Sequence, residues 1–104
     1  MEFVLIHKPI SLMPPEMMAA GLDMAKKIEA KPEEMVPGGK AIASYYARTL
    51  WRIFCIWEVP SIEALLPLAE QLKMLGWDTD IIPVDKPKVA IQKIEMAMQA
   101  SMKK

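Results

Sequence analysis

The chain has one cysteine and one histidine, Cys55 and His7, among its 104 residues. A single cysteine cannot form an internal disulfide, which excludes a disulfide-stapled domain and fits a reducing compartment. One cysteine and one histidine are also too few for a closed zinc site within one chain. No histidine or carboxylate near Cys55 in sequence could lower its pKa, so we expect a buried hydrophobic residue rather than a nucleophile.

The chain also lacks net charge and long apolar runs. Its thirteen basic and thirteen acidic residues cancel, so no overall field favours nucleic acid or an anionic membrane surface. No apolar run approaches the roughly 18 residues needed to span a bilayer, and the N-terminal stretch lacks the charged start and apolar core of a signal peptide. We therefore expect a cytoplasmic protein of one domain, residues 1–104, without a nucleic-acid or membrane partner.

Glycine-rich phosphate loops are missing too, because the Pro-Gly-Gly-Lys run at 37–40 precedes a predicted strand, whereas such loops precede a helix. We expect no cofactor. Ten methionines are the main excess. Clustered methionines can bind copper, but methionine is above all an adaptable packing residue, and we expect no metal.

Hydrophobic periodicity and turn residues predict the order strand, helix, strand, strand, helix, strand, followed by one more helix. Pro67 should bend the second helix or delay its start by a turn. Gly76 is placed to end that helix in the left-handed conformation, and Pro83 favours an edge position for the last strand. The predicted strands span 3–7, 40–46, 50–59 and 77–85, and the predicted helices span 15–29, 61–75 and 88–104.

This order predicts an α+β fold of the ferredoxin-like βαββαβ kind, with two helices on one face of a four-stranded antiparallel sheet. We expect the first and third strands side by side in the centre, parallel to each other. The third strand alternates Trp51, Ile53, Cys55 and Trp57 with Arg52, Phe54, Ile56 and Glu58. Both of its faces are therefore substantially apolar, although two helices can cover only one.

In element order and in the character of the third strand, the chain resembles the dimeric α+β barrel superfamily. That group includes proteins similar to muconolactone isomerase, to antibiotic-biosynthesis monooxygenases and to stress-response barrel proteins. The resemblance implies a homodimer in which two sheets pack face to face. The last helix has an apolar stripe of Val89, Ile91, Ile94, Met98 and Met102, which we expect to pack on the partner subunit or over the open edge of the sheet.

Parallel first and third strands would gather polar and aromatic residues at one end of the sheet. His7 is the candidate catalytic residue there, as an acid or base near neutral pH. The alternative is a strand-end histidine with a backbone partner. The residues expected at this end are His7, Lys40, Trp57, Glu58, Trp77 and Asp78.

A hairpin turn centred on residues 48–49 would set Tyr45 opposite Arg52, with Ala43 and Ala41 opposite Phe54 and Ile56. Two alanines facing two large side chains leave space. The candidate binding residues around this hollow are Tyr45, Arg52, Glu58 and Trp57. Alternatively, Arg52 and Glu58 pair with each other or across the dimer, and the alanines let a helix or a partner sheet approach.

Two functions of different class fit these residues. The first is a pocket for a small, apolar or aromatic compound, between sheet and helices or at the dimer interface. By resemblance, its chemistry would be isomerisation or cofactor-free oxidation. The second is a non-enzymatic dimer that binds another protein or a metabolite through an adaptable, methionine-rich surface.

Overall fold

A computed structural model describes residues 1–102. It has an α+β fold built on a four-stranded sheet in the order β2-β3-β1-β4, in which all neighbouring strands are antiparallel. The predicted α+β class and antiparallel sheet are confirmed. The strands are β1 (Glu2–Pro9), β2 (Lys40–Ala47), β3 (Arg52–Glu58) and β4 (Trp77–Val84).

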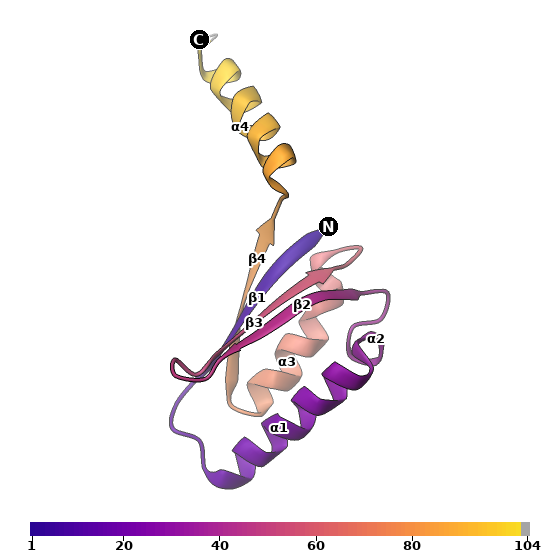
Figure 1. Cartoon of the computed structure of the whole chain (residues 1–104), viewed down its shortest axis with the longest axis vertical. Helices are drawn as coiled ribbons and strands as arrows, with labels where there is room; N and C mark the ends of the chain where they lie inside the picture. Colours follow the sequence, from indigo (N-terminus) through magenta and orange to yellow (C-terminus); the bar gives the residue numbers. More distant parts are fainter. Residues whose placement is uncertain (103–104) are drawn as a thin grey trace.

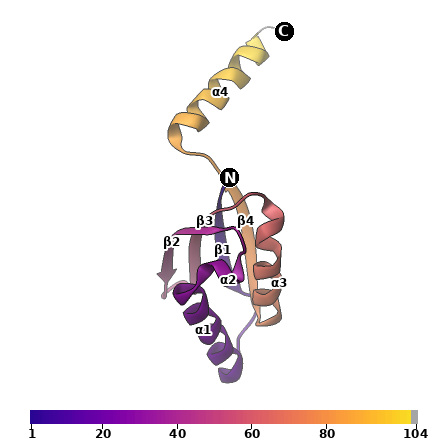
Figure 2. The same cartoon turned by 90° about the vertical axis from the view of Figure 1, so that its right-hand side faces the viewer.

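The helices α1, α2 and α3 lie on one face of the sheet, as the two views in Figures 1 and 2 show together. The helix α4 instead extends away from the body as a continuation of β4 (Figure 1). None of the helices within residues 1–102 is long and apolar enough to cross a membrane. The helical segments are α1 (Pro15–Ala30), α2 (Pro32–Met35), a 3-10 turn (Ile62–Leu65), α3 (Leu66–Met74) and α4 (Pro87–Met102).

The hydrophobic core lies between the sheet and α3. Burial alternates along β1, where Phe3, Leu5 and His7 are buried and their neighbours are not, as expected for a strand that points successive side chains to opposite faces. The core residues are Phe3, Leu5, Val36, Cys55, Trp57, Val59, Leu65, Leu68 and Leu72. The prediction of a buried Cys55 is confirmed.

The predicted direction of β3 is wrong. β1 and β3 are adjacent in the centre, as expected, but antiparallel, with Phe3 opposite Trp57 and His7 opposite Ile53. The crossover through α1 returns the chain in the direction of β1, but into β2, and the hairpin then reverses it into β3. The expected gathering at one end therefore fails, since His7 and Glu58 lie near opposite ends of the sheet.

The predicted hairpin register is also wrong, by two positions over most of its length. The loop spans residues 48–51 rather than 48–49, which pairs Tyr45 with Phe54 and Ala43 with Ile56. A shift of two keeps each side chain on its predicted face, because strand faces alternate with a period of two. A bulge between Ala41 and Ala43 then sets Ala41 opposite Trp57, on the other face.

Proline and glycine act as predicted around α3. Pro67 lies in the first turn of α3, and a 3-10 turn occupies the segment before it, so the α-helix starts about one turn late. Gly76 has φ +90° and ends α3 in the left-handed region. β4, which contains Pro83, is an edge strand. Ser61, the first residue of the predicted helix at 61–75, makes no side-chain capping hydrogen bond.

The second face of the sheet is not covered by any helix within residues 1–102. Val4, Ile6, Phe54 and Ile56 point to this open face and are partly exposed. α4 covers neither this face nor the edge of the sheet, and the apolar side chains of its stripe are exposed (Figure 1).

Candidate functional site

A cavity of about 360 Å³ lies between α1 and the helix-covered face of the sheet. We call it the inner cavity. Its volume falls within the range of small-molecule sites. Its sheet side includes His7, Ser44, Tyr46, Ile53, Cys55, Trp57 and Trp77, and its α1 side is Gly21, Ala25, Ile28 and Glu29.

The inner cavity exists because α1 presents small residues to the sheet. Gly21 and Ala25 are four residues apart and so lie on one face of the helix, where neither side chain can fill the space toward the strands. No residue of α1 is buried. A Cβ added at Gly21 would lie 3.0 Å from Nε1 of Trp77, so the indole of Trp77 and the bare backbone of Gly21 are already in close contact.

A second hollow, of about 470 Å³, adjoins the inner cavity toward the β2–β3 loop and shares Gly21, Ala25, Tyr46, Ile53 and Trp77 with it. We call it the outer hollow. Trp51, in that loop, has φ +52°, a conformation that costs a residue with a side chain about 1 kcal/mol. The rest of the lining of the outer hollow includes Met18, Leu22, Ala47, Arg48, Trp51 and Arg52.

His7 is 3% exposed and lines the inner cavity. Its Nδ1 lies 2.8 Å from Oγ1 of Thr79 on the neighbouring strand. This bond fixes the ring, while Nε2 has no hydrogen-bond partner within residues 1–102. Burial lowers the pKa of His7 from 6.5 to about 4, because desolvation penalises the charged imidazolium. The imidazole is therefore neutral at pH 7, and it is not poised to donate a proton there as the sequence suggested.

Two further side chains of the inner cavity have pKa values moved by burial. The pKa of Tyr46 is raised, first by desolvation and then by the nearby Cys55 and Glu29. Desolvation also raises the pKa of Cys55, against the opposing effect of its contact with Ser44, where Oγ and Sγ are 3.7 Å apart. Both groups are therefore neutral at pH 7, and Cys55 is not an activated thiolate.

Trp57 also lines the inner cavity, and it is 1% exposed. Its indole Nε1 is buried and has no hydrogen-bond partner among the described residues. An unpaired buried donor costs roughly 1–3 kcal/mol, and indole N–H groups usually find a partner when buried. This donor is therefore a buried polar group for which residues 1–102 supply no acceptor.

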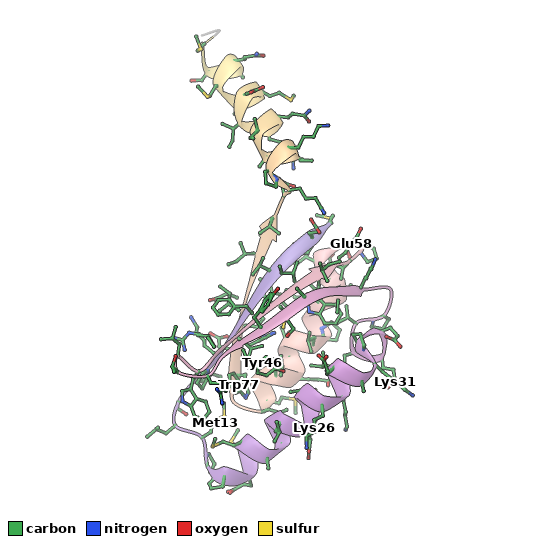
Figure 3. The ribbon with its side chains drawn as sticks, viewed as in Figure 1. Met13, Lys26, Lys31, Tyr46, Glu58 and Trp77 are labelled. Carbon is green, nitrogen blue, oxygen red and sulfur yellow. The ribbon has the colours of Figure 1, made fainter. Side chains whose placement is uncertain are left out.

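The structure separates the residues that the sequence grouped as one site. His7 and Trp57 line the inner cavity, and Arg52 lines the outer hollow. Tyr45 points to the open face and is 67% exposed, opposite Phe54. Glu58 lies at the far end of the sheet from Tyr46 and Trp77, as the labelled side chains in Figure 3 show.

Sequence reasoning missed Tyr46, Thr79 and the small residues of α1. Tyr46 adjoins Tyr45, which was the predicted binding residue. Because side chains alternate along a strand, Tyr46 lies on the face opposite to Tyr45. The spacing of Gly21 and Ala25 was the available signal, because two small residues one turn apart leave a gap beside whatever the helix covers. The predicted hollow beside Ala41 and Ala43 was placed on the face that carries Tyr45 and Arg52, whereas the inner cavity, which both alanines line, lies on the opposite, helix-covered face.

No group of three or more His, Cys, Asp or Glu side chains within residues 1–102 is placed to hold a metal ion. Comparison with known proteins adds no assignment, because neither a protein-family model nor a curated protein matches the chain.

Proposed function

We propose that the chain binds a small ring-containing compound in the inner cavity and outer hollow. The observation that carries this proposal is the cavity beside Trp57, whose buried indole N–H has no partner in the described chain. That nitrogen has almost no accessible surface, so a bound carbonyl or hydroxyl oxygen would supply the missing acceptor once the adjoining wall of the cavity shifts. Neutral His7, fixed by Thr79, offers Nε2 as a second polar contact.

The lining favours an aromatic acid or a quinone. Tyr46, Trp57 and Trp77 give the inner cavity aromatic walls, against which a planar ring can stack. Of the two spaces, only the outer hollow is lined by cationic residues, Arg48 and Arg52. The side chain of Arg52 shares the open face with Phe54, so a ring in the inner cavity would direct a carboxylate toward the guanidinium group of Arg48.

The proposal includes a homodimer of the ferredoxin-like, dimeric α+β barrel kind, formed through the open sheet face. Half-exposed apolar residues such as Phe54 and Ile56 support it, since a contiguous apolar face is rarely left in water. The reaction classes that the resemblance implies, isomerisation and cofactor-free oxidation, are to be tested on the ligands that bind, by following turnover of each compound with His7→Gln as the comparison.

A thermal-shift screen tests the pocket. We expect aromatic acids or quinones at about 100 times Kd to raise the melting temperature by roughly 10 °C, since such saturation adds about 2.7 kcal/mol of stability. Ala25→Leu should abolish the shift, because the larger side chain fills the inner cavity from α1. Ala30→Leu is the matched control, since Ala30 is on the same helix, is exposed and does not line either space.

Arg48→Ala tests whether the carboxylate of an aromatic acid contacts this arginine. It should weaken binding of an aromatic acid by about tenfold and leave the corresponding amide unaffected, because only the acid needs a cation. An equal shift with Ala25→Leu and Ala30→Leu would mean that the compounds bind elsewhere. No shift with any compound of either type would remove the proposed ligand class.

A protein-interaction role is the second candidate, and the exposure of α4 favours it. Met96, Met98 and Met102 are 69%, 59% and 82% exposed. A methionine-rich surface can adjust its side chains to the shape of a partner, which suits an interaction site. A second copy of the chain is the partner that we propose for this helix.

A further inference from the structure

Trp51 is a strained residue at the edge of the outer hollow. Among residues 1–102 it is the one residue other than glycine with a positive φ, +52°. It lines the outer hollow and is 50% exposed. Glycine or asparagine adopts such a backbone at a lower cost. The loop between β2 and β3 therefore carries its largest side chain where the backbone favours a small one, and a strained residue beside a pocket points to a role in binding.

The loop closes without help from the indole of Trp51. The N–H of Leu50 donates to the carbonyl oxygen of Ala47 at 3.2 Å. Nη1 of Arg52 donates to the carbonyl oxygens of Leu50 and Trp51, at 3.0 and 3.2 Å. These acceptors are backbone atoms, so the same bonds can form with any side chain at position 51. Trp51 also does not belong to the hydrophobic core or to the residues packed against it. Neither the turn nor the core accounts for the indole.

The bonds to the loop give Arg52 a role other than those predicted from the sequence. Glu58, its predicted pairing partner, is six residues further along β3, or about 20 Å, so the two cannot pair within one chain. No carboxylate of the described residues pairs with Arg52. Its guanidinium group instead holds the carbonyl oxygen of Trp51 itself, and so fixes the backbone from which the indole projects.

One loop thus supplies two groups to the outer hollow, the cation of Arg48 and the aromatic ring of Trp51. From α1, the hollow is lined by Met18 and Leu22 among others. Its volume of about 470 Å³ leaves room for a ring between the helix and the loop. A compound there would cover part of the exposed surface of the indole, which adds apolar burial and ring contact to its affinity.

We propose that Trp51 is a specificity-determining residue that packs on the ring of the bound compound, and that Arg52 is a positioning residue that holds Trp51 for this contact. This inference rests on the proposed function, because it requires a compound in the outer hollow. It adds a preference for planar aromatic rings, since the indole attracts an aromatic ring beyond what the buried area alone contributes.

Titration calorimetry with 2-naphthoate and 2-naphthamide tests the role of Trp51. We expect Trp51→Asn to weaken binding of both probes by about tenfold, because it removes the ring but keeps a residue that tolerates positive φ. Trp51→Phe should retain most of the affinity. Leu50→Ala is the matched control, since Leu50 is exposed in the same loop and lines neither space. Trp51→Asn should melt no lower than the wild type, which separates lost binding from lost folding.

A double-mutant cycle with 2-naphthamide tests whether Arg52 acts through Trp51. The amide has no carboxylate, so it needs neither arginine as a charge partner. We expect Arg52→Ala to weaken its binding by about fivefold in the wild-type chain and by less than twofold in the Trp51→Asn chain, because two residues that act as a unit are not additive.

Fluorine NMR gives a direct readout of the contact. The chain has three tryptophans, and Trp51→Phe identifies the resonance of residue 51 after labelling with 5-fluorotryptophan. The difference in its chemical shift between H2O and D2O reports exposure to solvent. Saturating 2-naphthamide should reduce this difference for Trp51, whereas Trp57, which is already buried, should show almost none with or without the probe.

Equal affinities of wild type and Trp51→Asn for both probes would overturn the inference and leave the proposed function in place. An effect of Arg52→Ala that is confined to 2-naphthoate, or that persists in the Trp51→Asn chain, would overturn the positioning role. No binding of either probe by the wild type would overturn the inference, and no shift in the whole thermal screen would overturn the proposed function as well.

Discussion

His7 shows how burial sets the chemistry of a single side chain. Its ring is held by Thr79 on one side and borders the inner cavity, and it has no acidic partner among the ion pairs of the described residues. Desolvation therefore dominates and lowers its pKa to about 4. The sequence supplied the residue type and its strand, but the depth of burial depends on residues far along the chain.

The lowered pKa predicts a pH dependence of stability. The unfolded chain takes up a proton at His7 below about pH 6.5 and the folded chain only near pH 4. Stability is therefore complete above pH 6.5 and decreases as the pH falls toward 4. We expect the lowered pKa of His7 to reduce the free energy of unfolding by about 2 kcal/mol between pH 7 and pH 4.5, measured by urea unfolding.

His7→Gln should remove that part of the pH dependence, because glutamine does not titrate. The comparison is the slope of unfolding free energy against pH in the two proteins, rather than the stability of either at one pH. Equal slopes for wild type and variant would show that folding does not shift the pKa of His7.

At the scale of elements, α4 is the helix whose apolar side chains stay exposed in the described chain. At about 100° per residue, Ile91, Ile94, Met98 and Met102 share one face, while Val89 lies on the opposite side and leaves the stripe that the sequence predicted. All of these side chains are exposed. The helix has its apolar face and a short connection to β4, but no surface of its own chain to cover (Figure 2).

Removing α4 should therefore weaken association between copies. We expect truncation after Lys88 to raise the dimer dissociation constant in sedimentation equilibrium, because an apolar face of this size is not left in water. Ile94→Asp should reproduce the effect, and Gln92→Asp, off that face, should not. An unchanged dimer with an unchanged melting temperature would show that α4 has another partner or none.

At the scale of the whole molecule, the sheet divides two environments. The helix-covered face holds the core and the inner cavity, whereas the open face is apolar in the middle and charged at its ends. This division follows from β3, which is apolar on both faces and central in the sheet. A second copy is the simplest cover for such a face.

We expect the wild-type chain to sediment as a dimer at micromolar concentration and Phe54→Lys to sediment as a monomer. Phe54 is partly exposed on the open face, so a lysine there places a charge in the interface without creating a hole in the core. Leu66→Lys, on α3 and 42% exposed, is the matched control and should remain dimeric. A wild-type monomer with well-dispersed amide signals would contradict both the dimer and the barrel arrangement.

Local signals in the sequence determined the elements and their order. Prolines and glycines act through the backbone of their own segment, so the late start of α3 at Pro67 and its end at Gly76 were predictable. Alternation along β3 likewise assigned its two faces, because strand periodicity is local. These features require no knowledge of which segments meet.

Only the tertiary structure decided which residues share a site. The direction of β3 relative to β1 depends on the path of the chain through α1 and the hairpin, and it moved Glu58 away from His7. The four-residue loop at 48–51 set the pairing of Tyr45, and alternation placed Tyr46 in the cavity instead. The cavity itself arises between Gly21 on α1 and a sheet built from other segments, because a space between elements belongs to no single stretch of sequence.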